Sequence, residues 1–434
     1  MAAPDLETLV SLARRRGFVF PSSEIYGGFG STWDYGPLGA ELIKNIKDAW
    51  WHDMVRTRDD MVGLNAAILM HPRVWEVSGH VANFNDPLVE CSTCKRRFRT
   101  DDAPELQCPY DGSALSAPRQ FNTMFKTFVG PLEDDAAVAY LRPETAQAIY
   151  VNFKNVLDSS RVRLPFGIAQ IGKAFRNEIT TGNFIFRSRE FEQMEIEYFV
   201  IPGEDERALE EWIDGCLTWY QRLGLDPRRL RLRPHRPAEL AHYSKATTDV
   251  EYAFPFGWGE IAGIANRTDY DLKAHSAASG VDLMFFDEAT KRHVLPYVIE
   301  PSLGVDRAAL AFLCDAFTTQ DVKGEPRVFL HLHPRLAPFK VAVFPLVRNK
   351  PPILDMAVRI HRDLLETWPS FFDATGSIGR RYARQDEAGT PFGITVDYES
   401  LDDGAVTVRH RDTMQQDRVS VDQLRAYLTE KLSA

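Results

Sequence analysis

Apolar residues recur every three to four positions in six stretches of the chain, which is the spacing of one face of an α-helix. This pattern predicts helices over residues 1–16, 38–56, 204–223, 306–317, 353–366 and 421–432. Shorter runs rich in β-branched and aromatic residues predict strands over 184–186, 192–201, 297–299, 340–346 and 406–409. Strands dominate the middle third and helices lie outside it, so we expect an α+β fold with helices packed on an antiparallel sheet.

Both patterns are interrupted between His333 and Pro338, where the sequence suits neither a helix nor a strand. A buried strand pattern resumes at Val341. We therefore expect a domain boundary near residue 337 and a C-terminal unit of alternating strands and helices over 338–434. A total of 434 residues suits two or three domains.

The chain has 51 Lys and Arg against 61 Asp and Glu, a formal net charge of −10. Asp5 and Glu7 lie in the first apolar stretch, unlike the positive start of a signal peptide, and no apolar run reaches the ~20 residues that span a bilayer. These features predict a cytoplasmic protein with no membrane partner. The acidic total argues against nucleic acid, although arginines concentrated on one surface still bind RNA.

Three of the five cysteines form a cluster with the spacing of a zinc ribbon. Cys91 and Cys94 make one pair, and Cys108 is followed by Asp111 where a ribbon would have its fourth cysteine. Zn²⁺ accepts a carboxylate oxygen, so a site with three cysteines and one aspartate is one interpretation. The alternative is a packed hairpin without metal. Cys216 and Cys314 are expected in the core.

The most informative stretch is a pair of strand-like segments around a polar loop that contains Gly182 and Asn183. This pattern predicts a hairpin that brings Arg176 and Arg187 near one another. Guanidinium groups suit phosphate, and the ring of Phe191 suits stacking on a base, so the hairpin indicates nucleotide binding. The alternative is an exposed hairpin whose charges lie in solvent.

A second segment favours the nucleotide interpretation. Gly304 follows a predicted strand, and Arg307 lies at the start of a predicted helix. An arginine beside a helix N-terminus is well placed to bind a phosphate group.

Together these segments resemble the three motifs of class II aminoacyl-tRNA synthetases. Residues 175–191 resemble motif 2, residues 304–307 resemble motif 3, and residues 34–39 with the following helix resemble motif 1, the dimer-forming element. The sequence segments 142–147, 191–195, 260–269 and 300–302 narrow the resemblance to glycyl-tRNA synthetases of the dimeric, single-chain type. Residues 376–382 and 384–391 resemble the anticodon-binding domain of that family.

The resemblance implies a specific domain organisation. Residues 1–337 would form the class II catalytic domain, an antiparallel sheet flanked by helices. This domain would carry a zinc-ribbon-like insertion at 88–120 and a mainly helical insertion at 201–256, between motifs 2 and 3. Residues 338–434 would form an α/β anticodon-binding domain.

The implied reaction joins glycine and ATP into glycyl-adenylate and then transfers the glycyl group to the 3′ end of tRNA(Gly). The resemblance implies catalytic roles for Arg176, Arg187 and Arg307. The implied ATP-binding residues are Arg176, Asn177, Glu178, Phe186, Arg187, Phe191, Glu260, Ile261, Gly304 and Arg307. Glu260 would hold Mg²⁺ with ATP, whereas its alternative role is a solvated carboxylate at a strand end.

Glycine offers no side chain, so its ammonium group is the natural handle for recognition. The resemblance assigns the glycine site to Arg99, Glu144, Phe191, Gln193, Glu195, Glu300 and Ser302. Three carboxylates around one ammonium are unfavourable without the cation, which indicates a ligand cage. Arg99 also suits a solvated charge beside its basic neighbours.

Three arginines near Tyr382 are candidates for anticodon contact. Arg380, Arg381 and Arg384 combine positive charge with an aromatic neighbour, which suits splayed single-stranded bases. The alternative is a basic helix face, and the resemblance to the anticodon-binding domain favours RNA.

Two other functions compete with a glycine-specific ligase. One is a non-catalytic, dimeric nucleic-acid-binding protein of synthetase descent, such as the accessory subunit of a mitochondrial polymerase. Such a protein should lack the phosphate arginines or the glutamate cage, which are present here. The other is a ligase for a different small amino acid.

Overall fold

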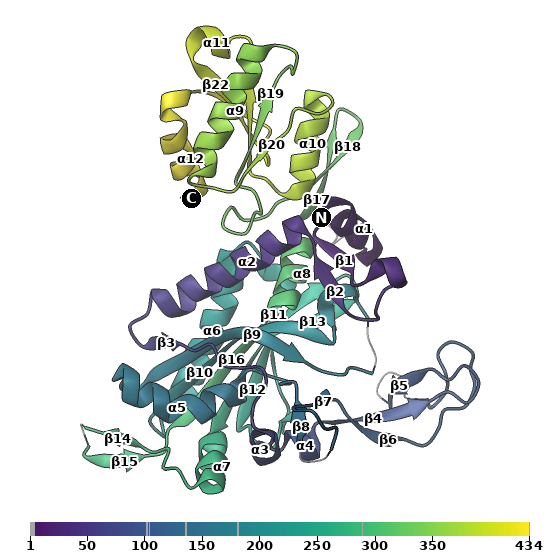
Figure 1. The fold of residues 1–434 in the computed structure, drawn as a ribbon, viewed down its shortest axis with the longest axis vertical. Helices are drawn as coiled ribbons and strands as arrows, with labels where there is room; N and C mark the ends of the chain where they lie inside the picture. The colour runs from purple at the N-terminus through teal and green to yellow at the C-terminus, as the bar shows by residue number, and fades with distance from the viewer. Residues whose placement is uncertain are drawn as a thin grey trace.

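The computed structural model describes residues 5–100, 103, 105–134, 137–179, 182–288 and 290–433. It contains two units, a larger one with a long twisted sheet and a smaller one formed by the C-terminal residues (Figure 1). Thr180 and Thr181 of the expected hairpin turn lie outside the described residues, as do residues 1–4 of the first expected helix. Among the described residues, no helix is long and apolar enough to cross a membrane.

A seven-stranded sheet forms the centre of the larger unit. Its order is β11-β12-β13-β16-β10-β9-β3, and every neighbouring pair is antiparallel except β3 and β9. The strands are β11 (Leu230–Pro234), β12 (Ala246–Phe254), β13 (Gly257–Thr268), β16 (Tyr297–Gly304), β10 (Glu190–Val200), β9 (Phe166–Phe175) and β3 (Met61–Gly63). The expected antiparallel sheet is therefore confirmed.

Helices cover both faces of this sheet, so central strands such as β10 are buried on both sides. Met194 and Ile196 of β10 belong to a core shared with α8 (Val305–Ala316), α6 (Asp205–Arg222) and α2 (Pro37–Trp51). Phe199 belongs to a second core with α5 (Ala146–Ser160) and α7 (Tyr270–Ser279). Since alternate residues of a strand face opposite ways, Glu195 and Glu197 share the α5 side with Phe199. The strand thus places carboxyl groups beneath α5.

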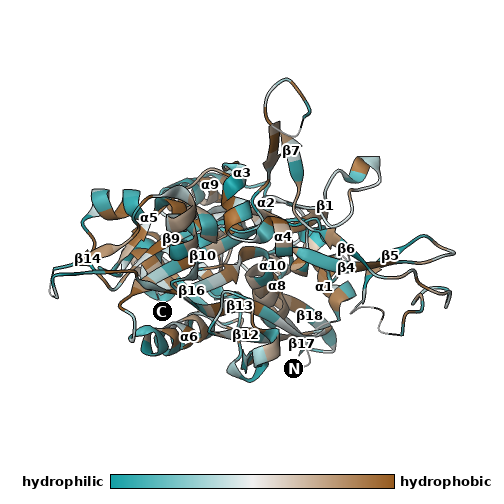
Figure 2. Ribbon diagram, turned by 90° about the horizontal axis from the view of Figure 1, so that it is seen from below, coloured by the Kyte–Doolittle hydropathy of each residue, from teal (hydrophilic) through white to brown (hydrophobic). Residues whose placement is uncertain are grey.

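Smaller elements surround the sheet. They are α1 (Leu6–Arg16), β1 (Val19–Pro21), β2 (Trp33–Tyr35), α3 (Pro72–Val77), α4 (His80–Asn83), β4 (Asn85–Glu90), β5 (Arg97–Arg99), β6 (Arg119–Asn122), β7 (Lys126–Phe128), β8 (Val138–Tyr140), β14 (Phe285–Asp287) and β15 (Arg292–Val294). Strands β5, β4 and β6 form a sheet that extends sideways from the larger unit (Figure 1), and the β7–β8 hairpin projects from it as well (Figure 2).

Two sequence predictions need correction. Residues Phe184–Phe186 form a 3₁₀ turn, not a strand, because Asn183 and Phe184 have φ angles of 57° and 60° and turn the chain away from an extended path. In the segment 201–256, only α6 and two short 3₁₀ turns, Pro227–Arg229 and Pro237–Glu239, are helical. Strands β11 and β12 of that segment extend the central sheet.

The C-terminal unit has a five-stranded sheet of order β20-β19-β21-β22-β23. Its elements are β19 (Val341–Pro345), α9 (Pro351–Leu365), β20 (Ser370–Phe372), α10 (Ile378–Ala388), β21 (Phe392–Val396), α11 (Ser400–Asp403), β22 (Ala405–His410), β23 (Gln416–Ser420) and α12 (Leu424–Ser433). Strands β20, β19 and β21 are parallel to one another, whereas β22 is antiparallel to both of its neighbours, β21 and β23. The alternation expected from the sequence is confirmed.

A hairpin of the larger unit docks against α10. It consists of β17 (Phe317–Val322) and β18 (Glu325–Leu330). Arg327 of β18 lies 2.8 Å from the carboxylate of Asp386, and Arg409 of β22 binds the same carboxylate at 3.0 Å. Arg16 at the end of α1 donates to Glu387 at 2.5 Å. Salt bridges with low solvent exposure therefore join the two units.

We expect Gly39→Ala to destabilise the larger unit. A Cβ atom at Gly39 would lie 1.8 Å from the carbonyl oxygen of Phe18, so α2 would have to move away from that backbone. Overpacking of this kind costs about 1–3 kcal/mol or more, measurable as a lower midpoint of thermal unfolding.

Gly215→Ala is the matched control, because Gly215 also lies within a helix and a Cβ atom there meets nothing within 4 Å. This variant should be neutral or gain up to about 1 kcal/mol. Equal effects of the two substitutions would contradict the packing argument.

Candidate active site

One pocket collects most of the residues that the sequence motifs single out. It lies where the loop between β9 and β10 meets β13, the end of β16 and the first turn of α8. Its lining consists of Arg176, Glu178, Ile185, Phe186, Arg187, Ser188, Phe191, Gln193, Glu260, Ser302, Gly304, Asp306 and Arg307. The structure therefore brings together every expected ATP-binding side chain except those of Asn177 and Ile261.

Those two residues have other contacts. The amide of Asn177 donates to the carbonyl of Thr123 at 2.7 Å, which fixes the chain just after Arg176. Ile261 is 1% exposed within the core, and its carbonyl accepts from the Tyr220 hydroxyl at 2.9 Å. The backbone at these positions shapes the pocket without placing a side chain on its wall.

Arg176 is held in place before any ligand arrives. Its Nε donates to the carbonyl of Pro143 at 3.0 Å, and its guanidinium carbon lies 5.3 Å from the ring centroids of both Phe84 and Phe191. Its backbone amide donates to the carbonyl of Arg189, which closes the loop between β9 and β10. A guanidinium positioned this way is oriented for an anion in the pocket.

Arg307 and Glu260 form a second pair at the pocket wall. Arg307 donates from Nε to the carbonyl of Phe186 at 3.2 Å and from Nη1 to the carbonyl of Glu260 at 3.1 Å. The same Nη1 lies 3.2 Å from the Glu260 carboxylate, and the guanidinium carbon is 4.5 Å from the Phe186 ring centroid. Arg307 lies in the first turn of α8, where the helix dipole adds to its positive charge.

A buried acidic cluster adjoins this pocket. Gln193 of the pocket donates to Ser302 Oγ at 3.2 Å and to Glu195 Oε1 at 3.4 Å, so it connects the two regions. Glu195 is 1% exposed, and its Oε2 accepts from the amide of Thr145 at 3.1 Å. Glu144 lies 3.2 Å from His80, and Glu300 is likewise buried. The structure thus brings Glu144, Gln193, Glu195, Glu300 and Ser302 together, as expected for a cation site.

Arg267 is the principal residue of this region that the sequence reasoning missed. It is 1% exposed and lies 3.0 Å from Glu300 and 2.7 Å from Asp271. Its guanidinium carbon is 3.7 Å from the ring centroid of Tyr243. Arg267 lies in the segment 260–269. An arginine within a long apolar strand is the signal in the sequence that indicates a buried ion pair.

Burial and mutual repulsion shift the titration of these groups. Burial raises the pKa of Glu300 to about 8 although Arg267 opposes the shift, and burial with Glu144 nearby raises the pKa of Glu195. Burial acts the same way on Glu144, but the pairing with His80 outweighs it and lowers the pKa of that carboxyl. The cluster therefore holds protons that a cation could displace.

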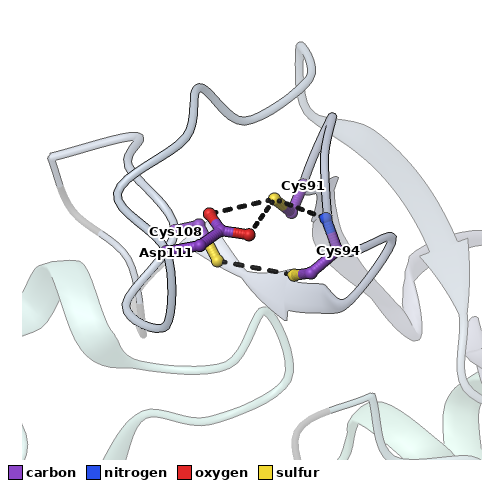
Figure 3. A group of neighbouring side chains, drawn as sticks. All are labelled: Cys91, Cys94, Cys108 and Asp111. Atoms are coloured by element: carbon purple, nitrogen blue, oxygen red, sulfur yellow. Dashed lines mark hydrogen bonds between the residues drawn. The ribbon is translucent and has the colours of Figure 1, made fainter.

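The cysteine cluster forms a compact group in the insertion, with all four ligand atoms within 4.8 Å of one another (Figure 3). Cys94 Sγ lies 3.6 Å from Cys108 Sγ, and Cys91 Sγ lies 3.5 Å from Asp111 Oδ1. The amides of Thr93 and Cys94 both point at Cys91 Sγ from 3.4 Å. The side chains converge on a common centre.

Arg99, on β5, was expected at the glycine site. It lies 3.5 Å from Asp86 and is not part of the lining of the pocket that contains Arg176.

Comparison with known proteins gives the family. Residues 129–316 match the tRNA synthetase class II core domain (G, H, P, S and T), and residues 340–431 match the anticodon binding domain. The glycine–tRNA ligase of Thermobifida fusca is 53% identical over 99% of this chain and 98% of its own length. The glycine–tRNA ligase of Streptomyces coelicolor is 53% identical over 100% of this chain and 99% of its own length. That of Geobacillus kaustophilus is 52% identical over 99% and 100%.

This chain belongs to the glycine–tRNA ligase family.

Membership in this family confirms the class II core and the anticodon-binding domain expected from the sequence. Within the latter domain, the three candidate arginines differ. Arg380 is exposed on α10. Arg384 donates to Asp373 at 3.1 Å. Arg381 is 3% exposed, and its guanidinium donates to the carbonyl of Gly376 at 2.8 Å and to that of Pro345. Arg381 therefore holds the backbone of its own domain, and this burial disfavours the expected anticodon contact.

The raised pKa of Glu300 predicts a specific dependence of stability on pH. A folded-state pKa of about 8 against an ordinary 4.5 means that folding takes up a proton within this window. The stabilising contribution is fully present below 4.5 and is lost as pH rises toward 8, at up to about 1.4 kcal/mol per pH unit and proton.

Thermal unfolding of the wild type and Glu300→Gln across this range would test the prediction. The wild-type midpoint should fall relative to that of the variant as pH rises, because glutamine does not titrate. Parallel pH profiles would show that Glu300 ionises normally in the folded protein.

Proposed function

We propose that this protein is an ATP-dependent glycine–tRNA ligase that forms glycyl-adenylate and then charges tRNA(Gly). The observation that supports it best is the arrangement of two adjoining sites. One site is an arginine-lined pocket suited to a nucleoside triphosphate. It connects, through Gln193 and Ser302, to a buried acidic cluster suited to the ammonium group of a small molecule. A carboxylate of glycine bound in the cluster would therefore face the α-phosphate of ATP in the pocket.

The first step needs positioning more than acid–base chemistry. The attacking carboxylate of glycine is ionised at neutral pH, so no general base is required. Its oxygen forms a bond to the α-phosphorus, and pyrophosphate leaves. Arg176, held by Pro143 and two aromatic rings, would stabilise the charge on the α-phosphate, while Arg187 and Arg307 would hold the outer phosphates.

Mg²⁺ fits the same pocket. The carboxylate of Glu260 is about half exposed at the wall, and Glu178 also lines it. Carboxylate and phosphate oxygens are the ligands that Mg²⁺ prefers, so Glu260 would hold the ion together with ATP. The metal would neutralise phosphate charge when bound.

Glycine selection would depend on the carboxyl groups of Glu144, Glu195 and Glu300. A bound ammonium offers three N–H donors and one positive charge to a region with an excess of buried acid. One additional methyl group is worth only about 1–3 kcal/mol of discrimination, so close packing beside Cα must also contribute. Ser302, Phe191 and Arg99 remain predicted contacts.

The anticodon-binding domain would recognise tRNA(Gly) with Arg380 and Arg384, both on α10. A homodimer formed around motif 1 and a cytoplasmic location stay predictions. The exposed apolar side chains of Ile25 (88%), Tyr26 (87%) and Phe29 (65%), just before motif 1, support pairing with a second copy.

The test of the proposed activity is amino-acid-dependent exchange between ATP and pyrophosphate, measured with each of the twenty amino acids. Glycine alone should support exchange, followed by glycylation of tRNA(Gly). Arg176→Ala should lower exchange by about a thousandfold or more, because a charge-stabilising contact in the transition state is lost.

Arg222→Ala controls for nonspecific effects of losing an arginine, since this exposed residue lies at the end of α6 outside the pocket lining. The rate of glycine-dependent exchange between ATP and pyrophosphate should be the same in Arg222→Ala as in the wild type. Exchange with another amino acid, or with none, would refute glycine-specific ligation and in the latter case favour the non-catalytic alternative.

We also propose that the cysteine cluster holds one Zn²⁺. A tetrahedral ion with Zn–S of about 2.3 Å and Zn–O of about 2.0 Å requires ligand separations of ~3.8 Å for S···S and ~3.5 Å for S···O. The separations of 3.6 Å between Cys94 and Cys108 and 3.5 Å between Cys91 and Asp111 fit those values. Ser113 N donates to Asp111 Oδ1 at 2.9 Å and orients the carboxylate.

Elemental analysis of the purified protein should therefore find one zinc per chain. Cys108→Ala should lower the content strongly, whereas Cys216→Ala, which removes a core cysteine outside the cluster, should leave it unchanged. A metal-free wild type purified without chelator would favour the hairpin without metal.

A further inference from the structure

Glu197 is a buried carboxyl that the roles proposed above leave unassigned. It follows Glu195 by two residues on β10, so both side chains face the α5 side of the sheet. The register that pairs Glu195 with Ser302 and Tyr198 with Ile299 places Glu197 directly opposite Glu300 on β16. One carboxylate oxygen from each of Glu195, Glu197 and Glu300 lies within 4.8 Å of the others.

The contacts of Glu197 are incomplete for an ionised group. Its side chain is 0% exposed, and Oε2 accepts from the hydroxyl of Tyr150 on α5. The second oxygen, Oε1, is buried and has no hydrogen-bond partner among the described residues. A carboxylate buried with an oxygen unpaired is strongly disfavoured, whereas a protonated carboxyl has an O–H that needs an acceptor.

The surroundings contain more acid than base. On the other side of β10, the residue opposite Glu197 is the uncharged Ile168 of β9. The charged or titratable groups that face this region are Glu195 on β10, Glu300 on β16, Arg267 on β13, Asp271 on α7, Tyr150 on α5, Tyr243 before β12, and Glu144 with His80. Two buried carboxyls opposite one another across a strand pair cannot both be ionised at ordinary cost.

Glu197 holds its proton more tightly than its neighbours because the other acids have stronger partners. Asp271 and Glu300 bind Arg267, Glu144 binds His80, and Glu195 accepts from the backbone amide of Thr145. Glu197 has only the Tyr150 hydroxyl. Burial, together with neighbouring Glu300, raises the pKa of Glu197 well above its usual range, in agreement with this comparison.

We propose that Glu197 is a positioning residue of the glycine site, a neutral carboxylic acid whose O–H donates to Glu300 and fixes the orientation of the Glu300 carboxyl for the substrate ammonium. This inference rests on the proposed function. Glu197 keeps its proton, whereas Glu300 releases its proton to solvent when the ammonium binds. The Glu197 side chain therefore contributes a hydrogen bond to the cage and adds no negative charge to it.

Two substitutions at this position separate a neutral donor from a charge. Glutamine keeps the shape and an N–H donor, whereas leucine keeps only volume. In pyrophosphate exchange, the glycine KM of Glu197→Gln should stay within about threefold of wild type, and that of Glu197→Leu should rise about tenfold or more with the ATP KM unchanged. Glu195→Gln is the comparator, because loss of an ionised cage carboxylate should raise the glycine KM strongly.

Infrared spectroscopy of the ligand-free proteins gives a readout that does not depend on activity. The wild type at neutral pH should show the carbonyl absorption of buried protonated carboxyls, shifted in D₂O, with contributions from Glu197 and Glu300, and Glu197→Gln should lose the Glu197 component while the Glu300 component stays. The spectrum therefore decides the protonation of Glu197 even if no amino acid supports exchange, which would instead defeat the proposed function.

Three results would overturn the inference. A glycine KM in Glu197→Gln raised as much as in Glu195→Gln would show an ionised Glu197 that binds the ammonium. Wild-type kinetics in both Glu197 variants would show that the residue does not position the site. Identical carboxyl bands in the wild type and Glu197→Gln would show that Glu197 carries no proton.

Discussion

The alternation of side chains along β10 is the constraint on which the rest of the catalytic unit depends. Even-numbered residues such as Met194 and Ile196 fill the core beneath α8, while Gln193, Glu195 and Glu197 face the opposite side. A shift of one residue in register would bury carboxyl groups in an apolar core and remove the acidic site at once. Fold and site are therefore specified by the same pairing of β10 with β9 and β16, and neither can change alone.

The same pairing explains why the two halves of the site adjoin. The β9–β10 loop and the start of α8 supply arginines to one end of the sheet, and the middle of β10 and β16 supplies carboxyl groups two to four residues further along. Gln193 stands at the join and donates to both regions. Positive charge for phosphates and negative charge for an ammonium are thus kept a few residues apart on a rigid sheet. Separation on rigid strands prevents the arginines from neutralising most of the acid.

Local patterns in the sequence predicted most of the fold and much of the site, and the errors have physical causes. Helices and strands with clear periodicity were confirmed, such as α8 and β10. Phe184–Phe186 was assigned to a strand because aromatic residues favour strands, yet two left-handed φ angles decide its conformation and composition does not report them. Strands β11 and β12 were missed because ladder pairing holds them in the sheet, β11 with β12 and β12 with β13, and composition does not report that pairing.

Charged residues were harder to assign than apolar ones. Arg381 looked like an RNA contact, but its guanidinium satisfies main-chain carbonyls inside the domain. Arg267 looked ordinary, but it binds two buried acids from β16 and α7. Sequence shows the charge of a side chain and not its partner, since the partner comes from another element. Most of the expected ATP-binding residues line one pocket because the motifs that contain them lie on segments that the sheet brings together.

The salt bridges between Arg327, Asp386 and Arg409, with Arg16 and Glu387 beside them, have a mechanical consequence. The contacts from Arg327 and Arg16 link the larger unit to α10, so the junction between the two units forms when the chain folds. A tRNA that contacted both the pocket and α10, as proposed above, would meet two surfaces that these contacts already link. The entropy lost in ordering the two units is then lost during folding, so it is not subtracted from the free energy of RNA binding.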